Sequence, residues 1–509
     1  MDVTRPVQNS TMFSATSSLI DTLVKRFDDR REELLAHREA YTNTLSQGNV
    51  AFPDATAHIR QEKWKIQTPS NLLERRVEMI GGATRSELVN GLNSGAKSYI
   101  ADLWNFTSGD TSNMVRAHRY LERASNLDLA YLPPEGGRVR INPQTTCRLT
   151  VVPRPLYVLE PGHLIGDEPV SATLYDLAHF VTNCGSTLKA RQGNILFYLR
   201  DVRTHLEARF WNDLFDVLEE YMQWTRGTIR ATVILDTVSA ALEAEEILFE
   251  LMHHSAGLSL DPQGYAADHI ALFNAPDRQT LPDRESIGLN APFLRALSLY
   301  AIGICHRRGC HAIGAASLVL PSRTAEKVKA EYLNMLGDKE REAVDGHDGT
   351  LVVHADTVTP TMVEFNKSMP LSNQLNYLRN DAISPADLIR RPEGSITVES
   401  LLAIIRSTLR NMVERQDHKG WIVQGSRVHD RSSIRLSLRL LWQWNKSEYG
   451  KITNSGLEIH DDLLKYLIKK ESDKMYGKGP EPVKKRAEAA VKHLLEQVTG
   501  DMLPLEPMV

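Results

Sequence analysis

The sequence predicts an α/β protein centred on a parallel (β/α)8 barrel, with helical regions before and after it. Short apolar runs alternate with amphipathic helical stretches over about 260 residues, which is typical of a parallel sheet. The number and length of these runs favour a closed barrel over an open sheet. Strand signals stop near residue 385. The chain is therefore divided into an N-terminal helical clasp (1–92), a barrel (93–384) and a C-terminal helical domain (385–509).

The predicted clasp begins with a long helix. Residues 17–46 are charged and place Leu19, Leu23 and Phe27 at a roughly helical period. A turn-rich segment follows at 47–72, and the glycine pair at 81–82 interrupts the chain before the barrel.

The barrel is predicted from apolar runs that are separated by helical patterns. Asp102 lies near the end of the first predicted strand, in AKSYIADL. The further predicted strands are 146–160, 193–199, 228–236, 269–274, 310–321 and 350–356, and the intervening helices are 204–223, 238–254, 291–307 and 323–335.

The C-terminal domain is predicted to be helical throughout. The segment after residue 385 and the stretches 433–447, 456–475 and 482–499 all show helical patterns. The basic run at 469–486 contains glycine and proline, and we expect it to be a mobile solvated loop.

The bulk composition argues against several classes of protein. Sixty Lys and Arg residues against 64 Asp and Glu give a formal net charge of −4, which is not the footprint of a nucleic-acid-binding protein. The chain has no apolar signal-peptide core and no apolar run of about 18 residues, so we expect neither a membrane span nor a membrane partner. The four cysteines form no CxxC pair, which indicates reduced thiols. With no SKL-type C-terminus, the expected location is cytoplasmic.

The most informative stretch is 203–236, where an amphipathic helix leads into a β-branched strand that ends on Asp236. In a parallel α/β barrel, side chains at the C-terminal ends of the strands face the active site. The position of Asp236 therefore predicts a metal ligand or a catalytic acid.

Several long motifs resemble the malate synthase family, in its shorter A-type form, and they occur in the family's order. They are HIRQEKWKI, RRVEMIGG, LNSGAKSYIAD, VVPRPLYVLEPGH, CHRRGCHAIGA, GHDGTLVVHA and LWQWNKS. The resemblance implies a TIM barrel with an N-terminal clasp and a C-terminal helical plug over the barrel mouth. It also implies Claisen condensation of acetyl-CoA with glyoxylate, followed by thioester hydrolysis, in an enzyme that uses Mg2+.

The resemblance assigns roles to particular residues of this chain. Arg154, in VVPRPL, matches the arginine that stabilises the enolate; a surface ion-pairing arginine is the alternative. Asp430, in VHDRSS, matches the catalytic base; an aspartate that caps the following helix is the alternative. Asp236 stands where the family has a metal-binding glutamate, so its reach is shorter by about 1.5 Å.

Other positions depart from the family pattern. The family's glycine-arginine-tryptophan-aspartate turn, which holds the second metal ligand, is absent. Alignment without a gap places Gly264 at the ligand position, and a short gap places Asp268 there. Any magnesium site is therefore expected to use Asp236 and Asp268 and to be weaker than in other members.

The segment after the first predicted strand also differs. Leu103, Trp104, Asn105 and Phe106 replace a family segment that contains two acids. These apolar side chains predict poor use of glyoxylate and better use of a bulkier acceptor, unless Trp104 and Phe106 only fill space behind the barrel wall. Arg435 stands where a glutamate is usual.

Three functions follow from these observations. The first is an acyltransferase that joins acetyl-CoA or another acyl-CoA to glyoxylate or a bulkier 2-oxo acid. The second is a related lyase, thioesterase or isomerase of specialised metabolism, with weak or absent metal dependence. The third is a non-catalytic relative, which is favoured if neither Asp236 nor Asp268 holds a metal. The first two imply small-molecule substrates as the partners; the sequence leaves the oligomeric state open.

Overall fold

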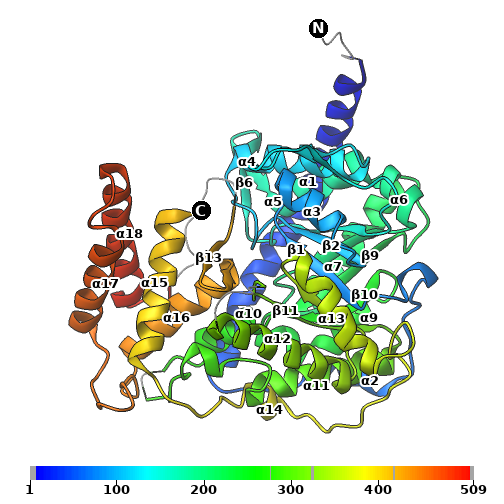
Figure 1. Ribbon diagram of the computed structural model, residues 1–509. Helices are drawn as coiled ribbons and strands as arrows, with labels where there is room; N and C mark the ends of the chain where they lie inside the picture. Colours follow the sequence, from blue (N-terminus) through cyan, green and yellow to red (C-terminus); the bar gives the residue numbers. More distant parts are fainter. Residues whose placement is uncertain (1–6, 276, 322–325, 416–418, 505–509) are drawn as a thin grey trace.

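The computed structural model describes residues 7–275, 277–321, 326–415 and 419–504. Its centre is a closed barrel of parallel strands, as the sequence predicts (Figure 1). In order around the barrel, the strands are β1 (Val77–Gly81), β12 (Gly349–Val352), β11 (His311–Ser317), β10 (Ser255–Leu260), β9 (Ile229–Leu235), β8 (Ile195–Leu199), β5 (Arg148–Val152) and β2 (Ser98–Asp102).

The barrel strands are buried almost throughout because helices cover their outer faces. Parallel strands that are covered on both sides read as continuous apolar runs, and ILFYL in β8 is an example. The helices between them are α3 (Arg85–Leu92), α4 (Thr111–Ser125), α5 (Ala172–Phe180), α6 (Ser186–Gln192), α7 (His205–Tyr221), α8 (Val238–Leu242), α9 (Ala244–Glu250), α10 (Pro262–Leu272), α11 (Pro292–Arg308), α12 (Glu326–Asp345) and α13 (Ala355–Ser368). Short antiparallel hairpins are inserted as β3 (Ala130–Tyr131) with β4 (Val139–Arg140), and β6 (Leu159–Ile165) with β7 (Glu168–Ser171).

The N-terminal clasp consists of the long helix α1 (Val7–Ser46) and the short helix α2 (Ala57–Gln61). Arg38 of α1 reaches the barrel, where it donates to Asp201 Oδ2 over 2.5 Å and to Glu207 Oε1 over 2.6 Å. All three side chains are largely buried, so this ion-pair network fixes the clasp beside the loop that follows β8.

Three sequence predictions about elements were wrong. The barrel begins at β1 within the predicted clasp, earlier than the expected boundary at residue 93. Residues 269–274 are not a strand but lie largely in α10. The run 469–486 is mostly helical, because α17 (Asp461–Tyr476) is followed closely by α18 (Glu481–Thr499). A short apolar run does not by itself distinguish a strand from a buried helix.

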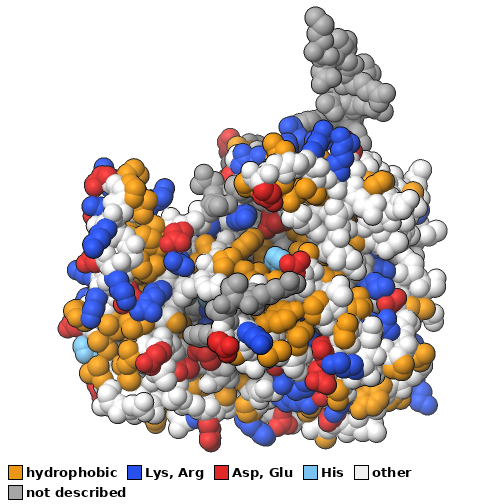
Figure 2. All heavy atoms as spheres, in the orientation of Figure 1, with side chains coloured by type: hydrophobic (Ala, Val, Ile, Leu, Met, Phe, Trp, Pro, Cys, Tyr) orange, Lys and Arg blue, Asp and Glu red, His pale blue; other side chains and the backbone are white. Residues whose placement is uncertain are grey.

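The C-terminal region is mainly helical, apart from one short hairpin that the sequence does not predict. Helices α15 (Val398–Glu414), α17 and α18 stand together at one side of the barrel (Figure 1). Besides these helices the region contains α14 (Pro385–Ile389), the hairpin β13 (Ile422–Gln424) and β14 (Arg427–His429), and α16 (Arg431–Lys446). None of the described helices is long and apolar enough to cross a membrane. Basic and acidic side chains are interspersed over the face shown in Figure 2.

The hairpin β13–β14 is bonded to the barrel where the strands end. Val428 N–H donates to the carbonyl of Leu318 over 2.8 Å, and Gly420 N–H donates to the carbonyl of Phe106 over 3.0 Å. A Cβ at position 420 would lie 2.8 Å from the carbonyl oxygen of Asn105, so glycine permits this close approach. The hairpin thereby brings the start of α16 over the barrel mouth.

Candidate active site at the barrel mouth

A small cavity lies at the C-terminal ends of the barrel strands, beneath the start of α16. Its walls combine apolar side chains from the strand ends with a few charged groups. The lining residues are Ile80, Phe106, Arg200, Ile234, Ser259, Leu260, Asp261, Pro262, Gln263, Ala316, Leu318, Leu351 and Asp430. An apolar pocket with a few convergent polar groups, at the catalytic face of a barrel, is the expected form of an active site.

The charged part of the mouth is organised around Arg200, which directly follows β8. Its Nε donates to Asp102 Oδ2 over 3.1 Å, and its Nη1 donates to Asp261 Oδ2 over 2.7 Å. Asp236 Oδ2 lies 3.9 Å from Nη1. Four strand-end residues from β2, β8, β9 and β10 therefore meet in one buried cluster.

Asp236 follows β9, as the sequence predicts, and it is 3% exposed. Both of its oxygens lie 3.2 Å from the backbone N–H of Asp201. Burial, and then the charge of Asp201, raises the pKa of Asp236 to about 7. The close approach of α10 needs Gly264, because a Cβ there would lie 2.9 Å from the Cβ of Asp236.

Asp268 does not join the Arg200 cluster through any hydrogen bond or ion pair between the described residues. It lies within α10, and its Oδ2 accepts the backbone N–H of Val238 over 2.9 Å at the start of α8. Its Oδ1 lies 3.5 Å from Arg203 Nη1. Each oxygen of Asp268 thus has a protein partner.

The expected pair of Asp236 and Asp268 therefore does not fit a magnesium ion in this arrangement. Mg2+ requires oxygen ligands at about 2.0–2.1 Å in near-octahedral geometry. Here the Asp268 carboxylate faces the start of α8 and the guanidinium of Arg203. The Asp236 carboxylate faces the backbone N–H of Asp201 and lies beside Arg200. Among the described residues, a compact set of three His, Cys, Asp or Glu ligand atoms occurs only at Asp216, Glu219 and His254.

Asp216, Glu219 and His254 lie at the end of the barrel opposite the mouth, where they form hydrogen bonds to the polypeptide chain. Glu219 accepts the backbone N–H groups of Gly227 and Ile229 at the start of β9. The two ring nitrogens of His254 lie 3.1 Å from the Ile229 carbonyl and 3.2 Å from Asp216. We assign these groups a structural role.

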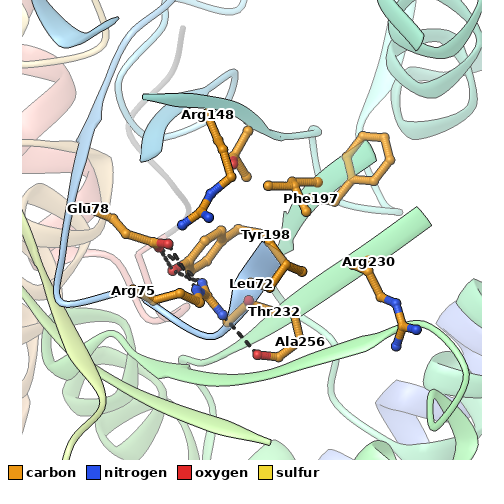
Figure 3. A pocket seen from close by; sticks show the side chains of 11 residues that line it. Leu72, Arg75, Glu78, Arg148, Phe197, Tyr198, Arg230, Thr232 and Ala256 are labelled. Carbon is orange, nitrogen blue, oxygen red and sulfur yellow. Dashed lines mark hydrogen bonds and ion pairs between the residues drawn. The ribbon is translucent and has the colours of Figure 1, made fainter. Parts of the chain in front are cut away.

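A polar network inside the barrel, toward the end opposite the mouth, is also structural (Figure 3). Arg75 donates to both oxygens of Glu78, to the carbonyl of Ala256 and to Tyr198 Oη. Tyr198 in turn donates to Glu78. Each of these charged groups is buried and has a hydrogen-bond partner. The network therefore satisfies the hydrogen-bonding needs of the polar groups at this end of the barrel.

Asp430 lies at the mouth and begins α16. Its Oδ1 accepts the backbone N–H of Ser433 over 3.0 Å, so it is a helix N-cap, and its carboxylate also lines the cavity. The interpretation of Asp430 as a helix cap is confirmed, and its role as the catalytic base stays a prediction. Burial, and then the neighbouring charge of Asp261, raises the pKa of Asp430 to about 6. A carboxylate with this pKa beside a cavity is suited to general-base chemistry near neutral pH.

Asn105 lies between Asp430 and Arg200. One terminal atom of its carboxamide lies 3.3 Å from Asp430 Oδ2 and 3.2 Å from both Nη atoms of Arg200. With the oxygen in that position, the amide accepts from both Nη atoms of Arg200. The amide that replaces a family acid is thus part of the site.

Arg154 lies in a separate ion-pair cluster and is not among the residues that line the cavity. Its Nε and Nη2 donate to the two oxygens of Asp176 over 2.9 and 2.7 Å, and its Nη1 donates to Glu160 over 2.7 Å. The side chain is 1% exposed. It is a buried arginine rather than a surface one, and a catalytic role for it stays a prediction.

The apolar residues after β2 divide into two groups. Phe106 lines the cavity. Trp104 instead packs beneath Arg431, whose guanidinium carbon lies 3.8 Å from the ring centroid, and Leu103 is fully buried. Leu103 and Trp104 therefore fill space in the protein interior, whereas Phe106 is placed where it can affect which acceptor fits the cavity.

The sequence interpretation missed Arg200 and Asp261. Asp261 follows the small-residue strand SAGLSL, and its Oδ1 caps α10 by accepting the N–H groups of Gln263 and Gly264. Arg200 follows the apolar run of β8 without an intervening residue. The rule that indicates Asp236, a charged residue at the end of a barrel strand, would have found Arg200, whereas Asp261 follows a strand that the sequence does not predict.

The comparisons with known proteins agree with this architecture. A family model described as malate synthase, TIM barrel domain, matches residues 148–391. The malate synthase of Streptomyces clavuligerus is 32% identical over 476 residues, covering 91% of this chain and 87% of the relative. The malate synthase of Myxococcus xanthus (strain DK1622) is 31% identical over 461 residues, covering 90% and 85%. The solved malate synthase pyruvate/acetyl-CoA ternary complex of Haloferax volcanii has 12% identity and a TM-score of 0.46, covering 82% of this chain and 98% of that one, a likeness too weak to carry an inference.

Proposed function

This chain belongs to the malate synthase family, and from that premise we propose that it is an acyltransferase acting at the barrel mouth. It would condense acetyl-CoA, or another acyl-CoA, with glyoxylate or a bulkier 2-oxo acid and then hydrolyse the thioester. The observation that supports this most directly is the convergence of Asp430 and Arg200 on one small cavity at the strand ends.

Asp430 would act as the base. Its carboxylate removes a proton from the carbon next to the thioester carbonyl, and the resulting enolate carbon forms a bond to the keto carbon of the acceptor. The keto oxygen becomes an alkoxide and takes up a proton. Water then cleaves the thioester, so that acyl-CoA, 2-oxo acid and water give a hydroxy diacid and free CoA thiol. The N-cap bond to Ser433 holds the base in place.

The composition of the cavity walls affects which acceptor can bind. Apart from Arg200, Asp261, Asp430 and a few neutral polar groups, the lining is apolar. No step of this mechanism is assigned to magnesium, because Asp236 and Asp268 do not form a fitting ligand pair. Arg154 stays a candidate for enolate stabilisation, with its charge already paired to Asp176 and Glu160.

The proposal is tested by thiol release from acetyl-CoA with a series of 2-oxo acids, measured with and without Mg2+. We expect turnover with at least one acceptor and poor use of glyoxylate. Saturation by micromolar glyoxylate with turnover near 1–1000 per second, the common enzyme range, would return the protein to ordinary malate synthesis.

Phe106→Leu is expected to widen the acceptor end of the cavity. The ratio of kcat/KM for a branched 2-oxo acid to that for glyoxylate should rise by roughly 10-fold, the scale of a methylene-sized change in an apolar pocket. Trp104→Phe is the matched control, since Trp104 is not among the lining residues. An equal ratio in wild type and both variants would show that Phe106 does not set acceptor size.

A second candidate is a lyase, thioesterase or isomerase related to the family. It is favoured by one observation, the occupation of the predicted metal region by Arg200. The same assay distinguishes it, because thiol release without any 2-oxo acid would identify a thioesterase.

A further inference from the structure

The barrel mouth concentrates negative charge that must be compensated inside the protein. Asp102, Asp236 and Asp261 are each at most 9% exposed, and they lie at the ends of three different strands. Buried carboxylates are retained where they are paired or where they coordinate a metal. The identity of the compensating cation is therefore the central question about this site.

We propose that Arg200 is the resident cation of the barrel mouth and that it takes the place of a divalent metal ion. Its guanidinium bonds to Asp102 and Asp261 and lies beside Asp236. The Asn105 carboxamide, with its oxygen toward Arg200, accepts from both Nη atoms. A planar fork of donors thus replaces the spherical ion that carboxylates from several strand ends would otherwise require.

The bonding of the carboxylates leaves little for an added ion. Asp261 Oδ1 accepts two backbone N–H groups, and its Oδ2 accepts from Arg200 and Ser432. Asp102 Oδ1 likewise accepts two backbone N–H groups, and its Oδ2 accepts from Arg200.

Charge repulsion would also exclude a metal. An ion bonded to Asp261 Oδ2 at about 2.1 Å would lie within about 5 Å of Arg200 Nη1, which binds the same oxygen. At that distance a doubly charged ion and a guanidinium repel strongly in a buried site. Asp261 can thus hold Arg200 or a metal, but not both.

The position of Arg200 also bears on the acceptor, and this step rests on the proposed function. Arg200 and Asp430 line the same cavity, so the guanidinium is the cation that a bound 2-oxo acid meets beside the base. It would polarise the keto oxygen as negative charge develops there.

Binding of Mn2+, followed by electron paramagnetic resonance, tests the proposal without any activity. Wild type should show no measurable Mn2+ binding at the mouth, whereas Arg200→Ala should bind Mn2+ there at least about tenfold more tightly than wild type does. Arg200→Lys retains the charge and should gain none. Mn2+ bound instead at Asp216, Glu219 and His254 can be recognised, because this binding is lost in Asp216→Asn and persists in Asp261→Asn.

Two results would overturn the proposal. One is wild-type Mn2+ binding that disappears in Asp261→Asn, and the other is a folded Arg200→Ala protein that gains no site. If Arg200→Ala does not fold, the wild-type and Arg200→Lys titrations still decide.

Turnover after chelation with EDTA is the functional arm. It should be unchanged for wild type, and a loss that Mg2+ restores would overturn the proposal. Absence of turnover with every acceptor would instead count against the proposed function, while the Mn2+ titration would still judge the role of Arg200.

Discussion

Asp430→Asn is expected to lower kcat by about 100- to 10,000-fold, the range in which a positioned general base contributes. The amide cannot accept the proton that the carboxylate removes. The fold should remain intact, because asparagine caps a helix N-terminus about as well as aspartate, and the bond from Ser433 N–H to the side chain can be kept. Thiol release gives the activity, and thermal unfolding gives the stability.

The pH dependence of the wild-type enzyme checks the same assignment. The pKa of Asp430 is raised to about 6, chiefly by burial. A base acts in its deprotonated form, so kcat/KM should fall as the pH decreases through about 6, by roughly tenfold per pH unit below it. Residual activity of Asp430→Asn should lack this acidic limb. An unchanged limb in the variant would assign the titration to another group.

Long periodic segments explain why much of the fold was predictable. The amphipathic pattern of α7 and the apolar run of β8 both correspond to single elements. The errors fall where this signal is weak. Strand β10 consists mostly of small residues, and α10 is buried on nearly all sides and so lacks an amphipathic period. For that reason the apolar run at the end of α10 predicts a strand.

The candidate site was predictable only in part. The sequence indicates Asp236 because it ends a predicted strand, and it indicates Asp430 only through the family resemblance; both lie at the mouth. The partners of these groups depend on contacts between residues far apart in sequence. Asn105 meets Asp430 across 325 positions, and Arg200 meets Asp261 across 61. Local pattern carries no information about such pairings.

Arg154→Met is expected to lower the free energy of unfolding by about 3–5 kcal/mol, because it leaves Asp176 and Glu160 buried without their cation. Arg123→Met is the matched control. Arg123 pairs with Asp128 on the surface, and its loss should cost less than about 1 kcal/mol. Chemical denaturation of both variants measures the difference, and equal stability of wild type and Arg154→Met would contradict the buried ion-pair assignment.

A compensated variant separates this structural role from a catalytic one. Combining Arg154→Met with Asp176→Asn and Glu160→Gln removes the unpaired charges, so most of the lost stability should return. The bond from His118 Nε2 to residue 176 can be retained by the amide. If turnover returns with stability, Arg154 supports the fold and is not required for catalysis, which leaves Arg200 as the candidate cation at the reaction centre. If the compensated protein is stable but inactive, Arg154 stabilises the enolate as the family resemblance implies, and its carboxylate partners hold it ready for that role.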